Sequence, residues 1–490
     1  MDWSTATRRI TECSKSLLCG NGGLGDELRV LQEYLEHEDV MVAYAAKEEL
    51  LKVLASGKIA NIYGFVHSLL LPPPFAWVRE SSGFRFQLLR QLIQMKKEVN
   101  PNEDRSQSGS SSDTWNQSKH YANVQIMLKH LNQIKTMVRS VFISTGCILI
   151  SVPHSVQFEA LVFVREFVKC LRGMKTIIYH QVELSGMISG LVEDVFVMMD
   201  YGFQSTYVSC AVLRLLSDFL EVLKYWNDRK DDNNWTSVRP VYLMSLKQCT
   251  IWVLQSSCST TALHLLTDKK RNRSHENFIA NMSFYSFTQH WLLFSSRVGV
   301  AVVEASKPQT NDFSLELLPL TGACKKLYAQ LPSRHQLFVV LAEQDSVLVK
   351  VLNNVTRIAD GVDDFRFLLL PEFTELLAEY DPDLLFADLI DTIRHDHLIL
   401  LDLLISNETE MLEYLMQHLR RFCKRWTTSK QKLQSYSRLE DVMGVLIRLR
   451  LEIDRLVAAD LFPYGAKPLT RRLMSIEKLY EEEPNKINKN

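Results

Sequence analysis

The stretch from Leu31 to Leu54 reads LQEYLEHEDVMVAYAAKEELLKVL and sets the structural class of this chain. Apolar residues recur at helical spacing on both sides of a short polar break that ends at Asp39. Aspartate is a favoured N-cap residue because its carboxylate accepts hydrogen bonds from the free amides of the first turn. We therefore predict two helices joined by a tight acidic turn. The inner face of the second helix is expected to hold Val40, Ala43, Ala46, Leu50 and Leu54.

A similar pair recurs late in the chain, where residues 337–358 read LFVVLAEQDSVLVKVLNNVTRI. Here Val347, Val351 and Val355 follow Asp345 in helical register. Two helices too apolar to stand alone are the building block of armadillo and HEAT-like stacks. No strict period runs through the whole chain, so we predict an all-α fold: an armadillo/HEAT-like irregular α-solenoid or helical array. A non-repeating helical bundle is the alternative, and residues 141–152 fit either a strand or a buried helix.

Composition favours helices and limits the classes of partner. The 490 residues include 46% hydrophobic residues, 18 Gly and 14 Pro. Glycine and proline disrupt helices, and their combined share is about half of the average share of roughly 12% in proteins. The 56 basic and 57 acidic residues nearly cancel, so no overall positive charge attracts the chain to nucleic acid or to an anionic membrane. The start lacks a secretory signal, and the most apolar window, residues 141–164, is broken by Pro153 and carries Glu159. We therefore expect a soluble chain with no membrane partner and no direct nucleic-acid partner.

Polar segments divide the chain. Residues 98–119 have too little apolar content to pack and predict a flexible insertion. The predicted domains are N-terminal helical repeats at 1–97, a central helical array at 120–435, a C-terminal segment at 436–480 and a disordered tail at 481–490. Nine scattered cysteines without a C-x-x-C pair indicate reduced thiols in the cytosol or nucleus, rather than a disulfide framework or zinc site.

Chemical motifs are few. Residues 20–25, GNGGLG, match the spacing of a dinucleotide-binding loop, but no βαβ context surrounds them, and a loop before a helix capped near Asp26 fits better. The P-loop, zinc-protease and nucleophile-elbow motifs do not occur in the sequence. The absence of these motifs weakens the interpretation as an enzyme without excluding it, and we predict no cofactor.

The segment His395-Asp396-His397 is the best remaining candidate for chemistry. With nearby aspartates such as Asp402 it would suit a metal-dependent hydrolase. On a helix, however, residues two apart point about 200° away from each other, so both histidines reach one metal only in an extended segment. The simpler interpretation makes Asp396 the N-cap of a helix that begins at His397.

The next helix is predicted to begin with a capping box at residues 407–410, NETE, with Asn407 in the cap position. Met411, Leu415, Leu419, Phe422 and Trp426 then share one face. The last turns hold a basic cluster, which either binds an acidic partner or interacts with the negative end of the helix dipole. The cluster consists of Arg420, Arg421, Lys424 and Arg425. A second basic run is either a nuclear-import signal or an ordinary solvated loop. It consists of Lys269, Lys270, Arg271 and Arg273.

Three blocks in the last 150 residues or so resemble the Lines family. They read LAEQDSVLVKVL at 341–352, DHLILLDLLISNETEMLEYL at 396–415 and LFPYGAKPLTRRL at 461–473. The resemblance implies a helical, non-enzymatic regulator of segment-polarity and Wnt-type signalling that is found in cytoplasm and nucleus and opposes zinc-finger transcription factors of the odd-skipped type. Gly465 stands where the family often has Asn, which leaves the partner open.

Physical reasoning adds one candidate surface to this block. Pro463 cannot continue the long helix predicted over residues 439–459, so Phe462 and Tyr464 must turn onto a surface. They either pack back on the last helices or form part of a partner groove. Taken with the predicted helical fold, the resemblance to the Lines family implies a scaffold that binds transcriptional regulators and modulates their localisation or stability. The alternatives are a transport or assembly adaptor of similar architecture and the metal-dependent hydrolase.

Overall fold

The computed structural model describes residues 3–19, 26–59, 61–71, 79–95, 124–142, 152–172, 190, 205–228, 235–255, 275–305, 334–341, 344–364 and 380–482. Throughout these segments the regular structure is helical, as predicted, and no strand occurs in them. In the same segments, no helix is long and apolar enough to cross a membrane. The chain forms two compact units, Met1–Gln248 and Cys249–Asn490.

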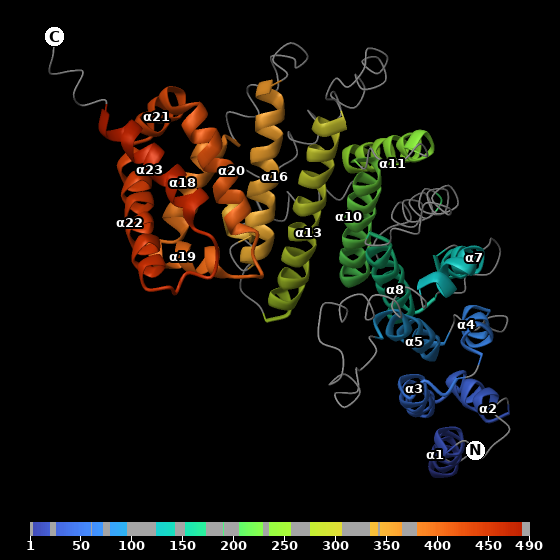
Figure 1. The fold of residues 1–490 in the computed structure, drawn as a ribbon. Coiled ribbons are helices and arrows are strands. Elements are labelled where there is room, and N and C mark those ends of the chain that lie inside the picture. Colours follow the sequence, from blue (N-terminus) through green and yellow to red (C-terminus); the bar gives the residue numbers. More distant parts are fainter. Residues whose placement is uncertain are drawn as a thin grey trace, which may run out of the picture. The chain divides into compact units, whose positions relative to one another are not determined.

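The N-terminal unit contains a row of consecutively packed helices. Along the chain its elements are α1 (Trp3–Cys19), α2 (Asp26–Leu35), α3 (Val40–Ala55), α4 (Ile62–Leu70), the 3-10 helix η2 (Glu80–Ser82), α5 (Gly83–Gln94), α7 (Leu131–Phe142), α8 (His154–Arg172), α10 (Thr206–Asp228) and the start of α11 (Trp235–Gln255). Helix α1 packs on α3, α3 on α5, α5 on α8, and α8 on α10. Helices α2, α4 and α7 pack against one side of this row, as Figure 1 shows.

The predicted pair of helices at residues 31–54 is confirmed. Asp39 caps α3, because its Oδ1 accepts a hydrogen bond of 2.9 Å from the Met41 amide. Four of the five predicted inner residues are buried, and Val40 remains 38% exposed in the first turn. The segment before residues 20–25 is helix α1 rather than a strand, and α2 begins at Asp26. Residues 20–25 themselves lie outside the described residues, as do residues 98–119 and 143–151.

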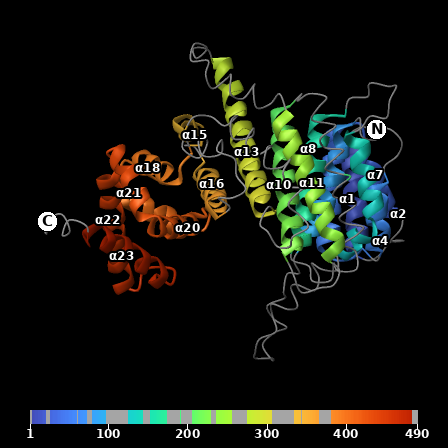
Figure 2. The same ribbon diagram turned by 90° about the horizontal axis from the view of Figure 1, so that it is seen from above.

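The C-terminal unit contains a second row, α13–α16–α20–α23, which can be followed in Figures 1 and 2. Helix α22 packs on α18, α19, α21 and α23. The elements are α13 (His275–Ala305), α15 (Arg334–Leu341), α16 (Asp345–Asp364), α18 (Pro382–Thr392), α19 (His397–Ile405), α20 (Met411–Lys424), α21 (Trp426–Ser435), α22 (Leu439–Ala458) and α23 (Lys467–Glu482). Helices α15 and α16 form the second predicted pair, and Val347, Val351 and Val355 are all buried.

An aromatic ladder joins the helices of this unit. His418 of α20 stacks on Phe386 of α18, with ring centroids 4.3 Å apart, and Phe422 follows at 5.8 Å. Trp426 lies 5.3 Å from Phe422 and 6.5 Å from Tyr480 of α23. The predicted apolar face of α20 is therefore a core that reaches from α18 to α23.

The predicted capping box at residues 407–410 is wrong. Helix α20 begins at Met411, and its N-cap residue Glu410 makes no side-chain capping bond. The local sequence has the right letters, but Asn407 is instead within hydrogen-bonding distance of Tyr464, 57 residues further along the chain. A tertiary contact thus outcompetes the local cap.

Candidate protein-interaction surface

The turn between α18 and α19 has an unusual backbone. Arg394 and His395 both have positive φ, at 55° and 58°, a region that residues other than glycine seldom adopt. The His395 amide donates to the Ile390 carbonyl at 2.9 Å, which closes the end of α18. Asp396 then caps α19 by accepting from the Leu398 amide at 2.8 Å, so its predicted capping role is confirmed.

Polar side-chain contacts and an ion pair hold this turn against α22. His395 Nε2 lies 3.1 Å from Asp391 Oδ1 and 3.8 Å from Asp441 Oδ2. Arg438 forms an ion pair with Asp391, and Arg448 donates to the His395 carbonyl at 3.1 Å. The turn is therefore fixed by groups from both α18 and α22.

The two histidines of the His395-Asp396-His397 segment have different neighbours. His395 faces the two carboxylates just described, whereas His397 Nδ1 lies 4.0 Å from Asp396 Oδ1. Asp402 is exposed on α19. In the segments that the structure describes, no three His, Cys, Asp or Glu side chains form a group that could hold a metal ion.

The α22–α23 connection carries the predicted aromatic pair. Phe462 and Tyr464 are in edge-to-face contact, with ring centroids 6.2 Å apart. The Tyr464 hydroxyl lies 2.6 Å from Asn407 Oδ1 and 3.1 Å from the Ile405 carbonyl. Having one proton, it can donate to only one of these acceptors at a time. The connection is thus fastened to the α19–α20 loop, while the Tyr464 residue remains 37% exposed. Partner binding by this pair stays a prediction.

Large apolar side chains are exposed on the elements next to this connection. Leu461 is 68% exposed, and Leu398, Ile399 and Val457 are 43–47% exposed. They lie on α19, on the last turn of α22 and on the following loop, and α19 packs on α22. Burying one such side chain in an interface contributes about 1.5–3 kcal/mol. We call this group, with Tyr464, the C-terminal apolar surface.

The basic cluster of α20 is divided between the interior and the surface. Arg421 has a side chain only 5% exposed, and its Nη1 lies 2.7 Å from Asp360 Oδ1 of α16. Arg420 and Lys424 are exposed, and Arg425 is half-buried. Arg421 therefore connects α16 and α20, and partner binding by the cluster stays a prediction. The other basic run, residues 269–273, lies outside the described residues.

A buried polar cluster lies between α18 and α20. Burial, together with the charge of Asp381, raises the pKa of Asp383 to about 6. Burial, together with the charge of Arg421, lowers the pKa of His418 to about 3. Burial also raises the pKa of Tyr414. Asp383 Oδ1, Tyr414 Oη and His418 Nδ1 are buried without a hydrogen-bond partner in the described structure.

The residue pattern did not predict this cluster, although one local signal was present. Asp381 precedes Pro382 at the first position of α18, which is a typical helix start. Asp381 accepts from the Asp383 and Leu384 amides and pairs with Lys432 of α21. The helix start was therefore readable, but the burial of Asp383 beside α20 was not.

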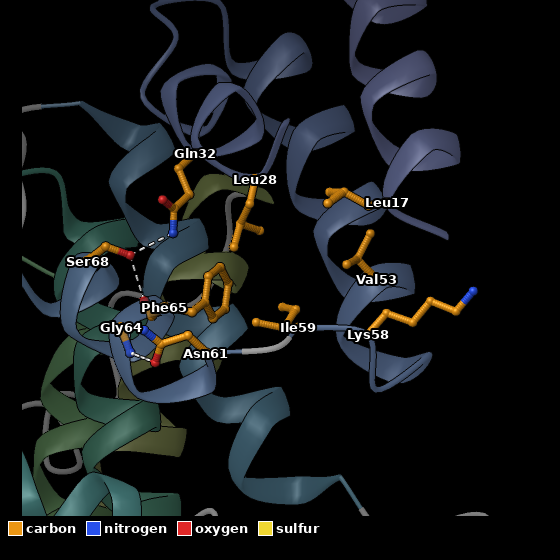
Figure 3. Close-up of a pocket in the computed structure, with 10 residues that line it drawn as sticks. All are labelled: Leu17, Leu28, Gln32, Val53, Lys58, Ile59, Asn61, Gly64, Phe65 and Ser68. Carbon is orange, nitrogen blue, oxygen red and sulfur yellow. Dashed lines mark hydrogen bonds between the residues drawn. The ribbon is translucent and has the colours of Figure 1, made fainter. Parts of the chain in front are cut away.

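A cavity of about 320 Å³ lies in the N-terminal unit among α1 to α4. Leu28, Ile59 and Phe65 line its centre, as Figure 3 shows. Most of its polar groups bond one another: Gln32 donates to Ser68 at 2.6 Å, and the Gly64 amide donates to Asn61 at 2.8 Å. Lys58, which also lines the cavity, donates to the Leu18 carbonyl. The cavity wall is thus mixed, with apolar side chains at its centre and with these polar groups already paired.

Comparison with known proteins places the C-terminal apolar surface within matched sequence. The family model described as Lines N-terminus matches residues 231–430, and the one described as Lines C-terminus matches residues 442–478. The chain belongs to the Lines family. The contact between Asn407 and Tyr464 joins the two matched regions.

A curated relative agrees with this assignment. Protein lines of Drosophila melanogaster is 36% identical over 143 residues, which are 28% of this chain and 16% of that protein. The match therefore spans about a sixth of the length of the relative. No solved structure matches the chain. The Lines family is not a known enzyme family.

Proposed function

We propose that this Lines family member is a non-enzymatic, armadillo-like helical scaffold. In this proposal it binds transcriptional regulators and modulates their localisation or stability in developmental signalling of the Wnt or segment-polarity type. Zinc-finger factors of the odd-skipped type are the proposed partners, and the protein acts in both cytoplasm and nucleus. The consecutive packing of α1, α3, α5, α8 and α10 supports the solenoid part of the proposal.

The single observation that carries the binding role is the C-terminal apolar surface. Leu461, at 68% exposure, projects from a loop that the Tyr464 hydroxyl fastens to the α19–α20 loop. A preorganised apolar surface loses little conformational entropy on binding, so it is suited to hold a partner. Its position in the two regions that match the Lines models supports a role connected with the family.

The test is affinity purification of the full chain from cytosolic and nuclear fractions, with partners identified by mass spectrometry. The Leu461→Asp variant places a charge on the surface without disturbing the core. Tyr436→Asp is the matched control, because Tyr436 is 56% exposed and lies before the other end of α22. A helix of 20 residues spans about 30 Å, so the two sites are far apart.

We expect transcriptional regulators with the wild type and the control, and their loss with Leu461→Asp. If only trafficking or assembly proteins are recovered, the adaptor alternative replaces this proposal. If Leu461→Asp retains every regulator, the C-terminal apolar surface is not the binding site.

A further inference from the structure

Basic side chains gather where α20 packs on α23 in the C-terminal unit. No Asp or Glu occurs from residue 414 to residue 439, which covers most of α20 and all of α21. None occurs in α23 before Glu477 either. Two stretches without acidic residues therefore pack on each other. We call a group of four cations on α20 and α23 the α20–α23 basic surface, namely Arg420, Lys467, Arg471 and Arg472.

The cations of this surface lack the carboxylate partners that other cations of the unit have. Arg357 bonds to Glu304, and Arg450 makes two hydrogen bonds to Glu477. In the part of the chain that the structure describes, no carboxylate lies within ion-pair distance of any member of the α20–α23 basic surface. Arg472 is half-buried, and the other three members are exposed. Their positive charge is therefore available to a partner.

Local helix electrostatics does not account for the three cations of α23. Lys467 is the first residue of that helix, and Arg471 and Arg472 begin its second turn. The N-terminal end of a helix carries a partial positive charge, which favours acidic residues there and disfavours a lysine. Helix α2 follows this rule with Asp26 and Glu27, whereas the first turn of α23 holds no acidic residue. The placement of these cations therefore indicates a role outside the helix itself.

Arg420 and Arg472 border the same residue, Cys423, from the two helices. Arg420 and Cys423 are three residues apart on α20, so they share one face of that helix. Burial raises the pKa of the Cys423 thiol, and the nearby charge of Arg472 opposes this rise. Arg472 of α23 therefore lies close to the same face of α20. Guanidinium groups bind carboxylates in a planar, bidentate geometry, so a pair of them around Cys423 suits a carboxylate ligand.

The uncharged side chains of α20 and α23, which the structure describes throughout, narrow the class of ligand. Every aromatic ring of these two helices is buried or half-buried, so neither offers a ring on which an unpaired base could stack. Met474 is the only large apolar side chain exposed on them, whereas a membrane-binding helix buries a whole apolar face. Duplex DNA binding by charge rests on about 6–10 phosphate contacts, more than these cations supply. An acidic protein segment is the ligand that remains.

We propose that the α20–α23 basic surface binds an Asp- or Glu-rich segment of a protein partner, with one carboxylate held between Arg420 and Arg472. Lys467 and Arg471, four residues apart on the exposed side of α23, bind further carboxylates of that segment. Arg420 lies in the region matched by the Lines N-terminus model and Arg472 in that matched by the Lines C-terminus model, so the site needs both regions. The inference does not rest on the function of the C-terminal apolar surface.

The test measures binding of labelled synthetic peptides to the full chain by fluorescence anisotropy. The probe repeats Glu-Glu-Leu, and the comparison peptide repeats Gln-Gln-Leu. Labelled single-stranded and duplex DNA are measured in the same way, and phosphatidylserine vesicles by sedimentation, because they offer negative charge of other kinds. The variants are Arg420→Gln and Arg472→Gln. Arg455→Gln is the matched control, because the Arg455 side chain is 76% exposed on α22 and pairs with Glu452. Circular dichroism checks that each variant is folded.

We expect the Glu-Glu-Leu peptide to bind, and each of Arg420→Gln and Arg472→Gln to weaken its binding by about threefold to fivefold. Added salt should weaken binding as well, because the attraction is between exposed charges. The Gln-Gln-Leu peptide should not bind, and Arg455→Gln should behave as the wild type does. No binding of the Glu-Glu-Leu peptide, equal losses in Arg455→Gln, or tighter binding of DNA or of the vesicles would each overturn the proposal.

Discussion

Opposed titrations are predicted for the buried cluster between α18 and α20. His418 is 1% exposed and stacks on Phe386, and burial lowers its pKa to about 3. Asp383 is 4% exposed, and burial beside Asp381 raises its pKa to about 6. Arg421, Lys432 and Ser429 act in the opposite direction on the pKa of Asp383.

The two groups change stability in opposite directions as pH falls. Unfolded histidine takes up a proton below about pH 6.5, but folded His418 does not until about pH 3. The free energy of unfolding therefore falls by about 2 kcal/mol between pH 7 and pH 5 on account of His418. Folded Asp383 takes up its proton near pH 6, which is above the pKa of aspartate in the unfolded chain. Asp383 therefore raises the free energy of unfolding by about 1 kcal/mol as the pH falls from 7 to 5. The wild type should therefore lose only about 1 kcal/mol.

Single variants should separate these contributions. Asp383→Asn removes the stabilising contribution of Asp383. The free energy of unfolding of this variant should therefore fall by about 2 kcal/mol from pH 7 to pH 5, on account of His418 alone. His418→Leu removes the destabilising contribution of His418. This variant should therefore be about 1 kcal/mol more stable at pH 5 than at pH 7. The double variant is the control and should show neither change.

The assay is amide hydrogen exchange of α20, corrected for the intrinsic pH dependence of exchange, because it reports opening of this unit alone. Two results would refute the reasoning. One is an unchanged pH profile in Asp383→Asn, and the other is a double variant that keeps the full loss seen in Asp383→Asn.

Three further changes test individual contacts. Tyr464→Phe removes the hydroxyl bonded to the α19–α20 loop and should speed amide exchange in that loop by an amount equivalent to about 1 kcal/mol, with no change in α3 as the reference. Asp396→Ala removes the α19 cap and should lower the stability of that helix by about 1 kcal/mol in the same measurement, while Asp396→Asn should retain most of it. Gly361→Ala places a Cβ 2.0 Å from Val303 Cγ1 and should destabilise the packing of α13 on α16 by about 1–3 kcal/mol in urea denaturation, and Val303→Ala in the same chain should restore part of the loss. Equal stability of Gly361→Ala with and without the second change would show that this contact is not the cause.

The sequence predicted the helices best where the signal was local. Asp39 and Asp396 each precede an apolar helical run, and each caps the expected helix, because the capping bond involves only neighbouring amides. The capping box at residues 407–410 failed for the opposite reason. The side-chain oxygen of Asn407 lies within hydrogen-bonding distance of the Tyr464 hydroxyl. A local sequence pattern cannot indicate a partner so far along the chain.

The candidate sites show the same division. The sequence singled out Phe462 and Tyr464 because Pro463 cannot continue a helix, but it did not show the surface on which they lie. It placed Arg420 and Arg421 in one basic cluster, whereas the structure leaves Arg420 exposed and pairs Arg421 with Asp360 of α16. Neighbours in sequence point in different directions on a helix, so their environments depend on what packs against each face.

The sequence by itself determined the helical class, several helix starts and the likeness to Lines proteins, because these depend on residue spacing and composition over short distances. Only the tertiary structure decided that Tyr464 meets Asn407, that Asp383 and His418 share a buried cluster, and that Tyr44 meets Phe84 and Phe158 meets Tyr207 across neighbouring helices. Such groupings arise when helices distant in sequence pack side by side. Burial and spacing across an interface are then properties of the packed helices rather than of any one segment.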